Sequence, residues 1–450
     1  MSANGSTTAT FQNHNGLPIA IVGGGLGGAA LAIGLLKHGV KVHIYEASQA
    51  FAEIGAGVGF GANATTALHL IDPRLLEGYM KHATINTDPE RENTFNTIRW
   101  GMDERRPNGA KAGDLGFHQA DAKKTPDAPT GFCMRGRIHR ARLLDEMVAL
   151  LPKDITSFGK SFQSVEEVGA GMLKISFADG TTTLASALIG CDGIKSKVRS
   201  FVCGRDVKPA YAHEGAIRAM APAEVVKKAL GEERALNGTL YCGYGGSCIT
   251  YPVDHGELIN MVAMPHDRSL TSTWDQDDWI VPTSADEVRE KFKDFYPPLI
   301  DLIARHTLPS KWALHTLRHD KPYFKGRVCL LGDSAHATTP HMGAGAGMAM
   351  EDAFLLSRLI ADVGSSDNIE AAFKAYDAVR RPRTQGCIQR SIENGLAYNF
   401  MVEGVEDDMN KLEQKLNENF RWLWYEDLEE QLRRAAKVLK ETSGHDVSQL

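Results

Sequence analysis

A run of glycines near the start of the chain has the spacing needed to hold a dinucleotide. Residues 23–28 read GGGLGG and lie between an apolar, β-branched stretch and a helical pattern. In such a turn Gly23 would allow the tight bend, Gly25 would let the backbone approach a pyrophosphate, and Gly28 would let the helix pack closely on its strand. The free N–H groups at the start of the helix would then hold the phosphates.

An acidic residue, Glu46, ends the next apolar stretch and indicates which dinucleotide is bound. It stands 18 residues beyond Gly28, close to the spacing of about 20 expected for a carboxylate that binds a ribose hydroxyl. A carboxylate would repel a 2′-phosphate, which favours FAD or NAD over NADP. A glycine turn alone is weak evidence, since such turns are common; the order strand, turn, helix, strand, acid carries the prediction.

Two later stretches also end in residues that could bind a nucleotide. Asp192-Gly193 follows an apolar strand pattern, and Gly332-Asp333 follows another and leads into a glycine-rich loop, residues 339–348. A carboxylate at a strand end accepts hydrogen bonds from sugar hydroxyls, and N–H groups at the next helix start can bond to flavin ring oxygens. The alternative for Asp333 is a helix cap, a common position for aspartate.

These three motifs, in this order, resemble the group A flavoprotein aromatic hydroxylases, which carry GxGxxG, then DG, then GD with a PxxGxG loop. The resemblance covers residue 17 to about 390, and salicylate hydroxylases and fungal phenol-dearomatising monooxygenases are the most similar in pattern. It implies an enzyme with bound FAD and with NAD(P)H as a transient reductant. O2 would form a flavin C4a-hydroperoxide, whose distal oxygen goes to a small phenolic or aryl-acid substrate.

The resemblance also implies roles for individual residues. Asp333 would bind the ribityl chain, and Asp192 would contact both the flavin and the reducing nucleotide. Gly59 and Arg140 would be further flavin neighbours, although the glycine run 53–59 could instead be a flexible surface loop. The residues of the proline loop that would lie beside the isoalloxazine are Pro340, Gly343, Gly345 and Ala346.

The middle of the chain changes to short alternating segments typical of antiparallel strands. These segments are 215–220, 239–244, 248–253 and 258–264. In the resembled family this second sheet holds the substrate, and an arginine and a tyrosine in its strands bind the phenolate. Arg218 and Tyr251 occupy such positions, and a permanent cation suits an ionised phenol. The alternatives are an Arg218 paired with a structural acid and a Tyr251 that serves only packing.

The order of these strand and helix patterns, together with the resemblance, predicts an α/β fold. We expect a discontinuous Rossmann-type FAD-binding domain, a second antiparallel-sheet substrate domain and C-terminal helices. A polar leader, residues 1–16, is expected to be disordered. The predicted divisions are 17–85, 130–200 and 325–390 for the FAD-binding domain, 86–129 for a loop-rich insertion, 201–324 for the substrate domain and 391–450 for the C-terminal helices.

Composition excludes several other classes of protein. The 450 residues include 50 basic and 56 acidic side chains, a net charge of −6, which excludes a nucleic-acid binder that works by bulk charge. Seven scattered cysteines without a CxxC pair predict neither a disulfide framework nor a zinc site and suit the cytoplasm. His336 and His341 lack the HExxH spacing of a metal site. The uncharged stretch 17–36 could span a bilayer, but its glycines and the absence of basic residues before it argue against a membrane segment.

Other functions stay open at this stage. They are dearomatising hydroxylation of a phenolic polyketide, a flavin-dependent dehydrogenase or reductase, and a flavin-binding sensor. The proline loop disfavours the last two, because neither needs a close-fitting cradle beside the flavin. A homodimer, the choice between NADH and NADPH and the identity of the aromatic substrate also stay open.

Overall fold

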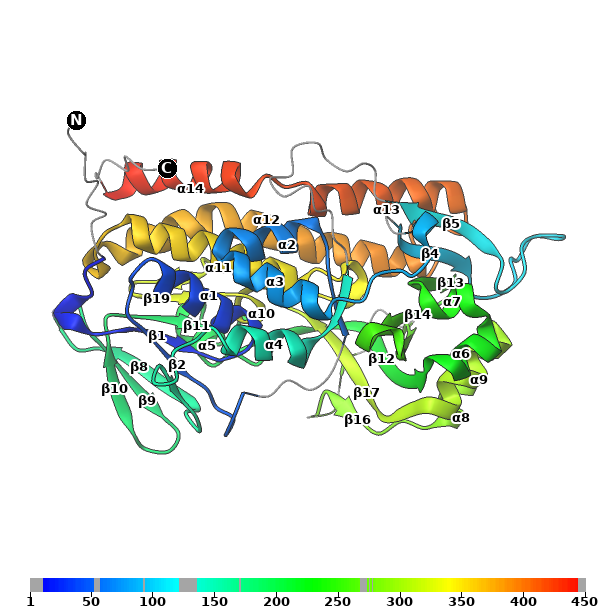
Figure 1. Cartoon of the computed structure of the whole chain (residues 1–450), viewed down its shortest axis with the longest axis horizontal. Coiled ribbons are helices and arrows are strands. Elements are labelled where there is room, and N and C mark those ends of the chain that lie inside the picture. The colour runs from blue at the N-terminus through cyan, green and yellow to red at the C-terminus, as the bar shows by residue number, and fades with distance from the viewer. Residues whose placement is uncertain are drawn as a thin grey trace.

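The computed structural model describes residues 11–51, 57–91, 94–120, 136–169, 171–267, 273–274, 276 and 278–443. Two sheets lie at opposite ends of an elongated molecule, and long helices run along the axis between them (Figure 1). The predicted strand–helix–strand unit forms at the N-terminal side as β1 (Ile19–Val22), α1 (Leu26–Lys37) and β2 (Val42–Tyr45).

The first sheet is mainly parallel and has six strands. Its order is β18 (Phe324–Lys325), β19 (Val328–Leu330), β11 (Ala187–Gly190), β1, β2 and β7 (Thr156–Ser157). Only β18 pairs antiparallel, and β1, β11 and β19 are buried along their whole length, as expected for parallel strands covered on both faces. Since these three strands are neighbours and parallel, their carboxyl ends meet at one edge and bring the Gly23 turn, Asp192 and Asp333 together.

Helices cover this sheet, and α1 packs against α11 next to it. The other helices of this half are α2 (Ala62–Ile71), α3 (Pro73–His82), α4 (Arg140–Val148), α5 (Val198–Val202), α10 (Asp333–His336), α11 (Gly345–Asp362), α12 (Ile369–Tyr398) and α14 (Leu428–Ser443). Two small sheets complete this half of the molecule: β3 (Gly57–Phe60) with β6 (Gly136–His139), and β8 (Phe162–Glu167) with β9 (Leu173–Phe177) and β10 (Thr182–Ala185).

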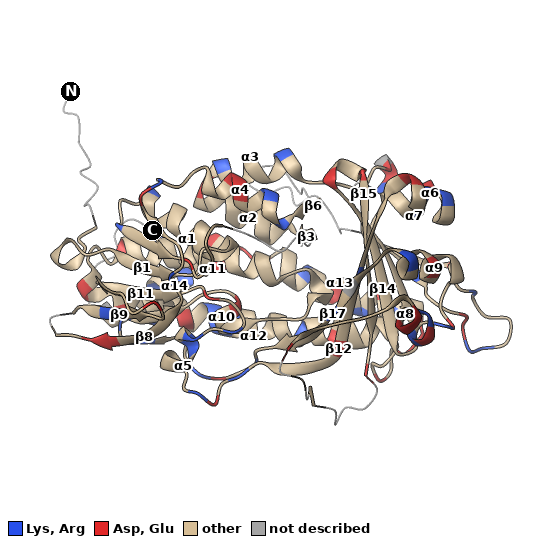
Figure 2. Ribbon diagram, turned by 90° about the horizontal axis from the view of Figure 1, so that it is seen from below, with Lys and Arg blue, Asp and Glu red and all other residues tan. Residues whose placement is uncertain are grey.

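The second sheet has eight strands and is antiparallel except where β13 pairs with β4. Its order is β16 (Ile280–Val281), β17 (Thr307–Thr316), β12 (Ala210–Pro222), β15 (Leu258–Pro265), β14 (Gly246–Val253), β13 (Thr239–Gly243), β4 (Thr94–Trp100) and β5 (Leu115–Ala120). The four antiparallel strands predicted from the middle of the chain are therefore confirmed. Figure 2 shows β12, β14 and β15 side by side, with basic and acidic residues interspersed over the whole ribbon.

Each face of the second sheet packs against different helices. The outer face buries Ile217, Met261 and Tyr241 in a core shared with α6 (Ala223–Leu230), α8 (Ala285–Lys291) and α9 (Pro297–His306); α7 (Glu232–Leu236) lies beside α6. The inner face turns toward the rest of the molecule, and α13 (Met409–Trp424) packs near its β5 edge. Short 3-10 turns complete the chain: η1 (His14–Gly16), η2 (Pro89–Arg91), η3 (Asp254–Gly256), η4 (Pro340–Met342) and η5 (Ser366–Asn368).

Several predicted boundaries differ from the structure. The insertion 86–129 contributes two strands to the second sheet, β4 and β5, whose aromatic and β-branched residues favour a strand. The expected division at 390/391 cuts through α12, and the one at 200/201 cuts through α5. Helix α12 continues because it has buried residues on both sides of the expected division, and in α5 the buried Val198 is followed by the half-buried Phe201 and Val202, which pack against the same core.

The two ends of the chain also differ from expectation. Within the predicted disordered leader, Phe11 is buried and Gln12 pairs with Ser365, so the leader cannot extend to residue 16; residues 1–10 lie outside the described part. The apolar pattern 412–439 forms two helices, α13 and α14. Among the described helices, none combines the length and apolar character that crossing a bilayer requires.

Candidate active site

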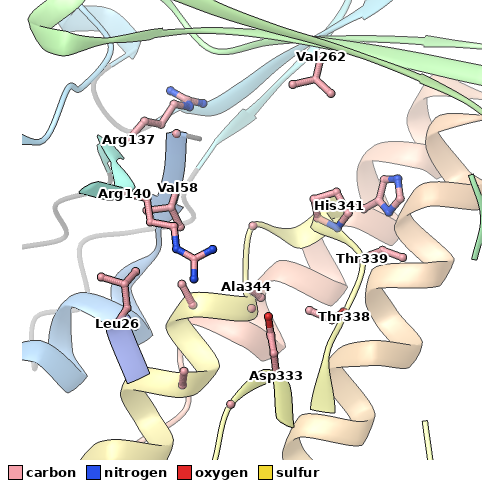
Figure 3. A pocket seen from close by; sticks show the side chains of 18 of the residues that line it. Leu26, Val58, Arg137, Arg140, Val262, Asp333, Thr338, Thr339, His341 and Ala344 are labelled. Atoms are coloured by element: carbon pink, nitrogen blue, oxygen red, sulfur yellow. The ribbon is translucent and has the colours of Figure 1, made fainter. Parts of the chain in front are cut away.

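A cavity of about 370 Å³ lies where the carboxyl edge of the first sheet faces the inner surface of the second (Figure 3). The glycine turn and the N-termini of α1 and α11 form its floor, and β14 and β15 form the opposite wall. Predicted site residues that line it are Gly25, Gly59, Arg140, Tyr251, Asp333, Pro340, Gly343, Gly345 and Ala346. Those that do not line it are Gly23, Gly28, Glu46, Asp192 and Arg218.

The glycine turn is packed too closely for side chains at two positions. Gly23 has a φ of 107°, and a Cβ there would lie 2.3 Å from the Cys191 carbonyl oxygen. A Cβ on Gly28 would lie 2.1 Å from the Gly23 carbonyl oxygen, which is far inside van der Waals contact. Gly25 begins α1 as its N-cap and borders the cavity. The turn therefore presents bare backbone and a helix N-terminus, an arrangement that binds anions.

Glu46 braces the same turn from the end of β2. One carboxylate oxygen accepts the Gly24 N–H at 2.7 Å, and the other accepts the Ser48 N–H at 2.8 Å. Each oxygen of a carboxylate can accept more than one hydrogen bond, so this role leaves acceptor capacity for a ligand hydroxyl.

Asp192 and Asp333, the two aspartates that follow strands β11 and β19, differ in their hydrogen bonds. Asp192 Oδ2 accepts the N–H groups of Lys197 and Val198 at 2.8 and 3.2 Å, while its Oδ1 is buried without a hydrogen-bond partner among the described residues. Asp333 is the first residue of α10, is exposed to the cavity and caps no N–H group of that helix. The helix-cap alternative therefore does not describe Asp333, and its oxygens face open space.

The proline loop is held from behind by α12. Ser391 Oγ donates to the Thr339 carbonyl at 2.7 Å, and the Tyr398 hydroxyl donates to the His341 carbonyl at 3.0 Å. Gly343 has a φ of 58°, a left-handed conformation that turns the loop into the start of α11. The loop consequently presents the N-terminus of α11 to the cavity.

A buried ionic network, absent from the sequence predictions, fixes the turn that carries Asp333. The Asp352 carboxylate accepts the Gly332 N–H at 3.0 Å and lies 2.6 Å from His336 Nε2, and Arg380 Nε donates to it at 2.7 Å. Burial alone would raise the pKa of Asp352, but His336 and Arg380 outweigh burial and lower it to about 2. Neighbouring Glu351 pairs with Arg380 and Arg383, which ties α11 to α12.

The sheet side of the cavity is mostly apolar and includes Tyr251. Leu240, Ile249, Val262 and Met264 line it together with this tyrosine. The Tyr251 hydroxyl donates to the Gly57 carbonyl at 3.3 Å. Burial raises the pKa of Tyr251, and the Arg137 and Arg218 guanidinium groups act against that rise.

Arg218 lies on the same face of the second sheet as the residues that line the cavity, but it does not line the cavity itself. It lies opposite Val262 in the neighbouring strand, and Val262 lies opposite Ile249. Its guanidinium lies 4.8 Å from the centre of the Trp312 ring, and it makes no ion pair within the described part of the chain. A structural acid as its partner, the alternative raised from the sequence, is not found there.

Two further arginines reach the cavity from the β6–α4 junction. Arg140 extends into the space in front of Ala344, and Arg137 lies nearer the second sheet (Figure 3). The sequence predicted Arg140, whereas Arg137 was missed, although the two residues stand only three positions apart. Gly59 pairs with Arg137 and lines the cavity; most of its glycine run, residues 53–56, lies outside the described part.

The two histidines considered as metal ligands each face one carboxylate. His336 faces Asp352, and His341 Nε2 lies 2.8 Å from Glu214 Oε2. In the described ranges no group of three or more acidic, histidine or cysteine side chains could hold a metal ion.

Comparisons with known proteins show the family to which the chain belongs. The family described as FAD binding domain matches residues 17–391. The chain is 36% identical to 6-methylsalicylate 1-monooxygenase atA of Aspergillus terreus, over 95% of this chain and 93% of that protein. It is 35% identical to a salicylate hydroxylase of Pseudomonas putida, over 94% of this chain and 96% of that protein. A solved salicylate hydroxylase substrate complex superposes with a TM-score of 0.80 and 31% identity, covering 93% of this chain and 98% of that one.

Proposed function

Because the chain belongs to the FAD binding domain family and is an FAD-dependent monooxygenase, we propose that it hydroxylates a small phenol that carries a carboxylate, using NAD(P)H and O2. The observation that carries the proposal is the cavity itself, which places two helix N-termini opposite an apolar sheet that carries Tyr251. The named substrates of two relatives, salicylate and 6-methylsalicylate, support this substrate class.

The residues at the floor of the cavity and directly behind it fit FAD. Within this proposal, the α1 N-terminus at Gly25 holds the diphosphate, Glu46 binds the adenosine ribose and Asp333 binds the ribityl hydroxyls. The lack of room for a Cβ at Gly28 and the uncapped carboxylate of Asp333 support these roles. When bound, FAD supplies the chemistry that moves electrons from NAD(P)H to O2 and delivers one oxygen atom to the ring.

The isoalloxazine would lie beside the proline loop. There the N–H groups at the start of α11 are free to bond to ring oxygens, and Arg140 adds a positive charge. Asp192 has one buried oxygen without a partner among the described residues, and a hydroxyl or N–H group of a bound nucleotide would satisfy it.

On the substrate side, the chain excludes water and supplies positive charge. The apolar wall formed by Ile249, Val262 and Met264 would pack on the ring of the substrate. Arg218 and Tyr251 would hold the phenolate, since a guanidinium stabilises the ionised oxygen that makes the ring electron-rich. Deprotonation of the phenol is favoured in the same way, because a nearby cation lowers the pKa of an acid.

The cytoplasm is the compartment we propose, supported by the free thiols of the six described cysteines. A homodimer stays a prediction, which light scattering of the purified protein would test.

The first experiment identifies the cofactor and the reaction. Purified protein is heated, and the released flavin is identified by chromatography; the holoenzyme is then supplied with NADH or NADPH and with salicylate. The proposal requires FAD, substrate-stimulated consumption of O2 and a hydroxylated product identified by mass spectrometry. Protein that holds FAD but reduces only artificial acceptors, with no product from any phenolic acid, would contradict it.

A further inference from the structure

Arg137 is a buried cation that lines the cavity and has no acidic partner in the part of the chain that the structure describes. Its residue surface is 8% exposed, and within the described residues it makes no ion pair. The titratable groups that face it are two tyrosines, Tyr79 and Tyr251. Burial lowers its pKa to about 10, so the guanidinium stays charged at neutral pH.

Neutral oxygens hold this guanidinium in one orientation. Nη2 donates to the Phe95 carbonyl at 2.6 Å and to Asn96 Oδ1 at 3.0 Å, and Nη1 donates to Asn86 Oδ1 at 3.3 Å. An arginine has five N–H groups, so these three hydrogen bonds leave two, one of them on Nε, for a ligand.

The absence of a side chain at Gly238 leaves room for the Arg137 guanidinium. A Cβ on Gly238 would lie 2.0 Å from Arg137 Nη2, so any larger residue there would displace the guanidinium. The Gly238 N–H donates to the same Asn86 oxygen that binds Arg137, which couples the two positions. A buried charge is costly unless it is paired. The described residues provide rigid support and space around the guanidinium but no acidic partner, which points to a ligand as the source of the anion.

The position of Arg137 relative to Tyr251 indicates which ligand group it meets. Its guanidinium lies 5.3 Å from the centre of the Tyr251 ring, and Arg218 also acts on the same tyrosine. Two cations therefore flank Tyr251, one from β6 and one from β12. A substrate with two anionic groups, a phenolate and a carboxylate, can satisfy both cations at once, whereas a simple phenol can satisfy only one.

We propose that Arg137 is the specificity-determining residue that binds the substrate carboxylate and so selects aromatic acids over neutral phenols of the same shape. This inference rests on the proposed function, because it assigns one group of the substrate to one residue. The role of Arg218 is still to bind the phenolate, and the role of Arg140, which extends toward the proline loop, is still to contact the flavin.

The test compares two probes that differ in charge and hardly in shape, salicylate and salicylamide. Their dissociation constants for the oxidised holoenzyme are measured from the change in flavin absorbance, and both are then assayed as substrates. The wild-type enzyme is expected to prefer salicylate. Arg137→Met is expected to bind salicylate about ten- to a hundredfold more weakly, the loss expected for a hydrogen bond to a charged group, and to bind salicylamide unchanged.

Two further substitutions of Arg137 separate the effect of its charge from the effect of its shape. Arg137→Lys retains the charge without the planar fork and should recover part of the preference. Arg137→Gln retains a neutral donor and should behave like Arg137→Met, which covers the case in which the methionine variant does not fold.

Arg234→Met is the matched control. Arg234 also donates to neutral acceptors, Tyr296 Oη at 2.7 Å and the Gly113 carbonyl at 3.2 Å, and stacks 5.3 Å from a tyrosine ring. It does not line the cavity, so its loss should leave the salicylate preference unchanged.

Three results would overturn the inference. They are equal affinity of the wild-type enzyme for both probes, equal weakening of both probes in Arg137→Met, and loss of FAD from that variant, which would assign Arg137 to the flavin. Failure of the proposed function looks different, because the wild-type enzyme would then hold FAD and form no product from any phenol.

Discussion

Replacing Asp352 with asparagine should weaken FAD binding from a position that lines no part of the cavity. Asp352 is fully buried, and its carboxylate holds the Gly332 N–H, His336 and Arg380 together. The amide keeps the shape but removes the charge, which leaves Arg380 and Arg383 with Glu351 as their one buried acidic partner among the described residues. The Gly332 turn that presents Asp333 should loosen in consequence.

The size of the effect follows from the pKa of Asp352. A pKa lowered from 3.8 to about 2 corresponds to roughly 2–3 kcal/mol of extra stability when the group is ionised. Because the pKa of the folded state lies below that of the unfolded state, this contribution is fully present above pH 3.8 and is lost as the pH falls toward 2. Asp352→Asn should therefore lower the melting temperature at neutral pH by about 3 °C, and the difference from wild type should shrink below about pH 4.

The assay measures the melting temperature and the FAD retained after dialysis, with and without added FAD. Asp362→Asn serves as a control on the same helix, because burial raises the pKa of Asp362 and its charge costs stability at neutral pH. Its amide should leave the melting temperature unchanged or raise it. Wild-type stability and full flavin content in Asp352→Asn would refute the argument that this carboxylate holds the turn.

Three further predictions concern the proposed cofactor and substrate sites. Asp333→Ala should fold with the wild-type melting profile of the apoprotein yet retain little FAD on dialysis; full flavin content would remove its ribityl role. Gly28→Ala should abolish FAD binding, because its Cβ would lie 2.1 Å from a carbonyl oxygen; flavin absorbance equal to wild type would show that the turn can relax. Arg218→Ala should keep FAD but uncouple the reaction, so that NAD(P)H oxidation continues while hydrogen peroxide replaces product, and Arg218→Lys should recover part of the coupling. If both variants couple NAD(P)H oxidation to product formation at normal rates, Arg218 does not bind the phenolate and Tyr251 becomes the leading candidate.

Local sequence patterns were enough to predict the parts of the fold that depend on short-range order. The strand–turn–helix–strand unit around Gly25 and the apolar strands before Asp192 and Asp333 each lie within a few tens of residues, and parallel pairing then joins their ends. The antiparallel strands between residues 210 and 265 were also readable from their alternation.

The features that were missed depend on pairings between distant segments. Strand β4 pairs with β13, about 140 residues away, so no local pattern distinguishes it from a polar insertion. The Asp352–Arg380 pair joins two helices, and both residues resemble ordinary charges of a helix surface in the sequence. Arg137 was passed over for the same reason: its value as a buried cation depends on Asn86, Phe95 and Gly238, which only the folded chain brings to it.

The source of the oxygen atom in the product tests the central claim most directly. The wild-type holoenzyme is supplied with NAD(P)H and the phenolic acid that it turns over, under isotopically labelled O2 in ordinary water, and the product is examined by mass spectrometry. An FAD-dependent monooxygenase incorporates one labelled oxygen atom into each product molecule and consumes one NAD(P)H for it. A product that carries no label, or labelled hydrogen peroxide in place of any hydroxylated product, would contradict the account.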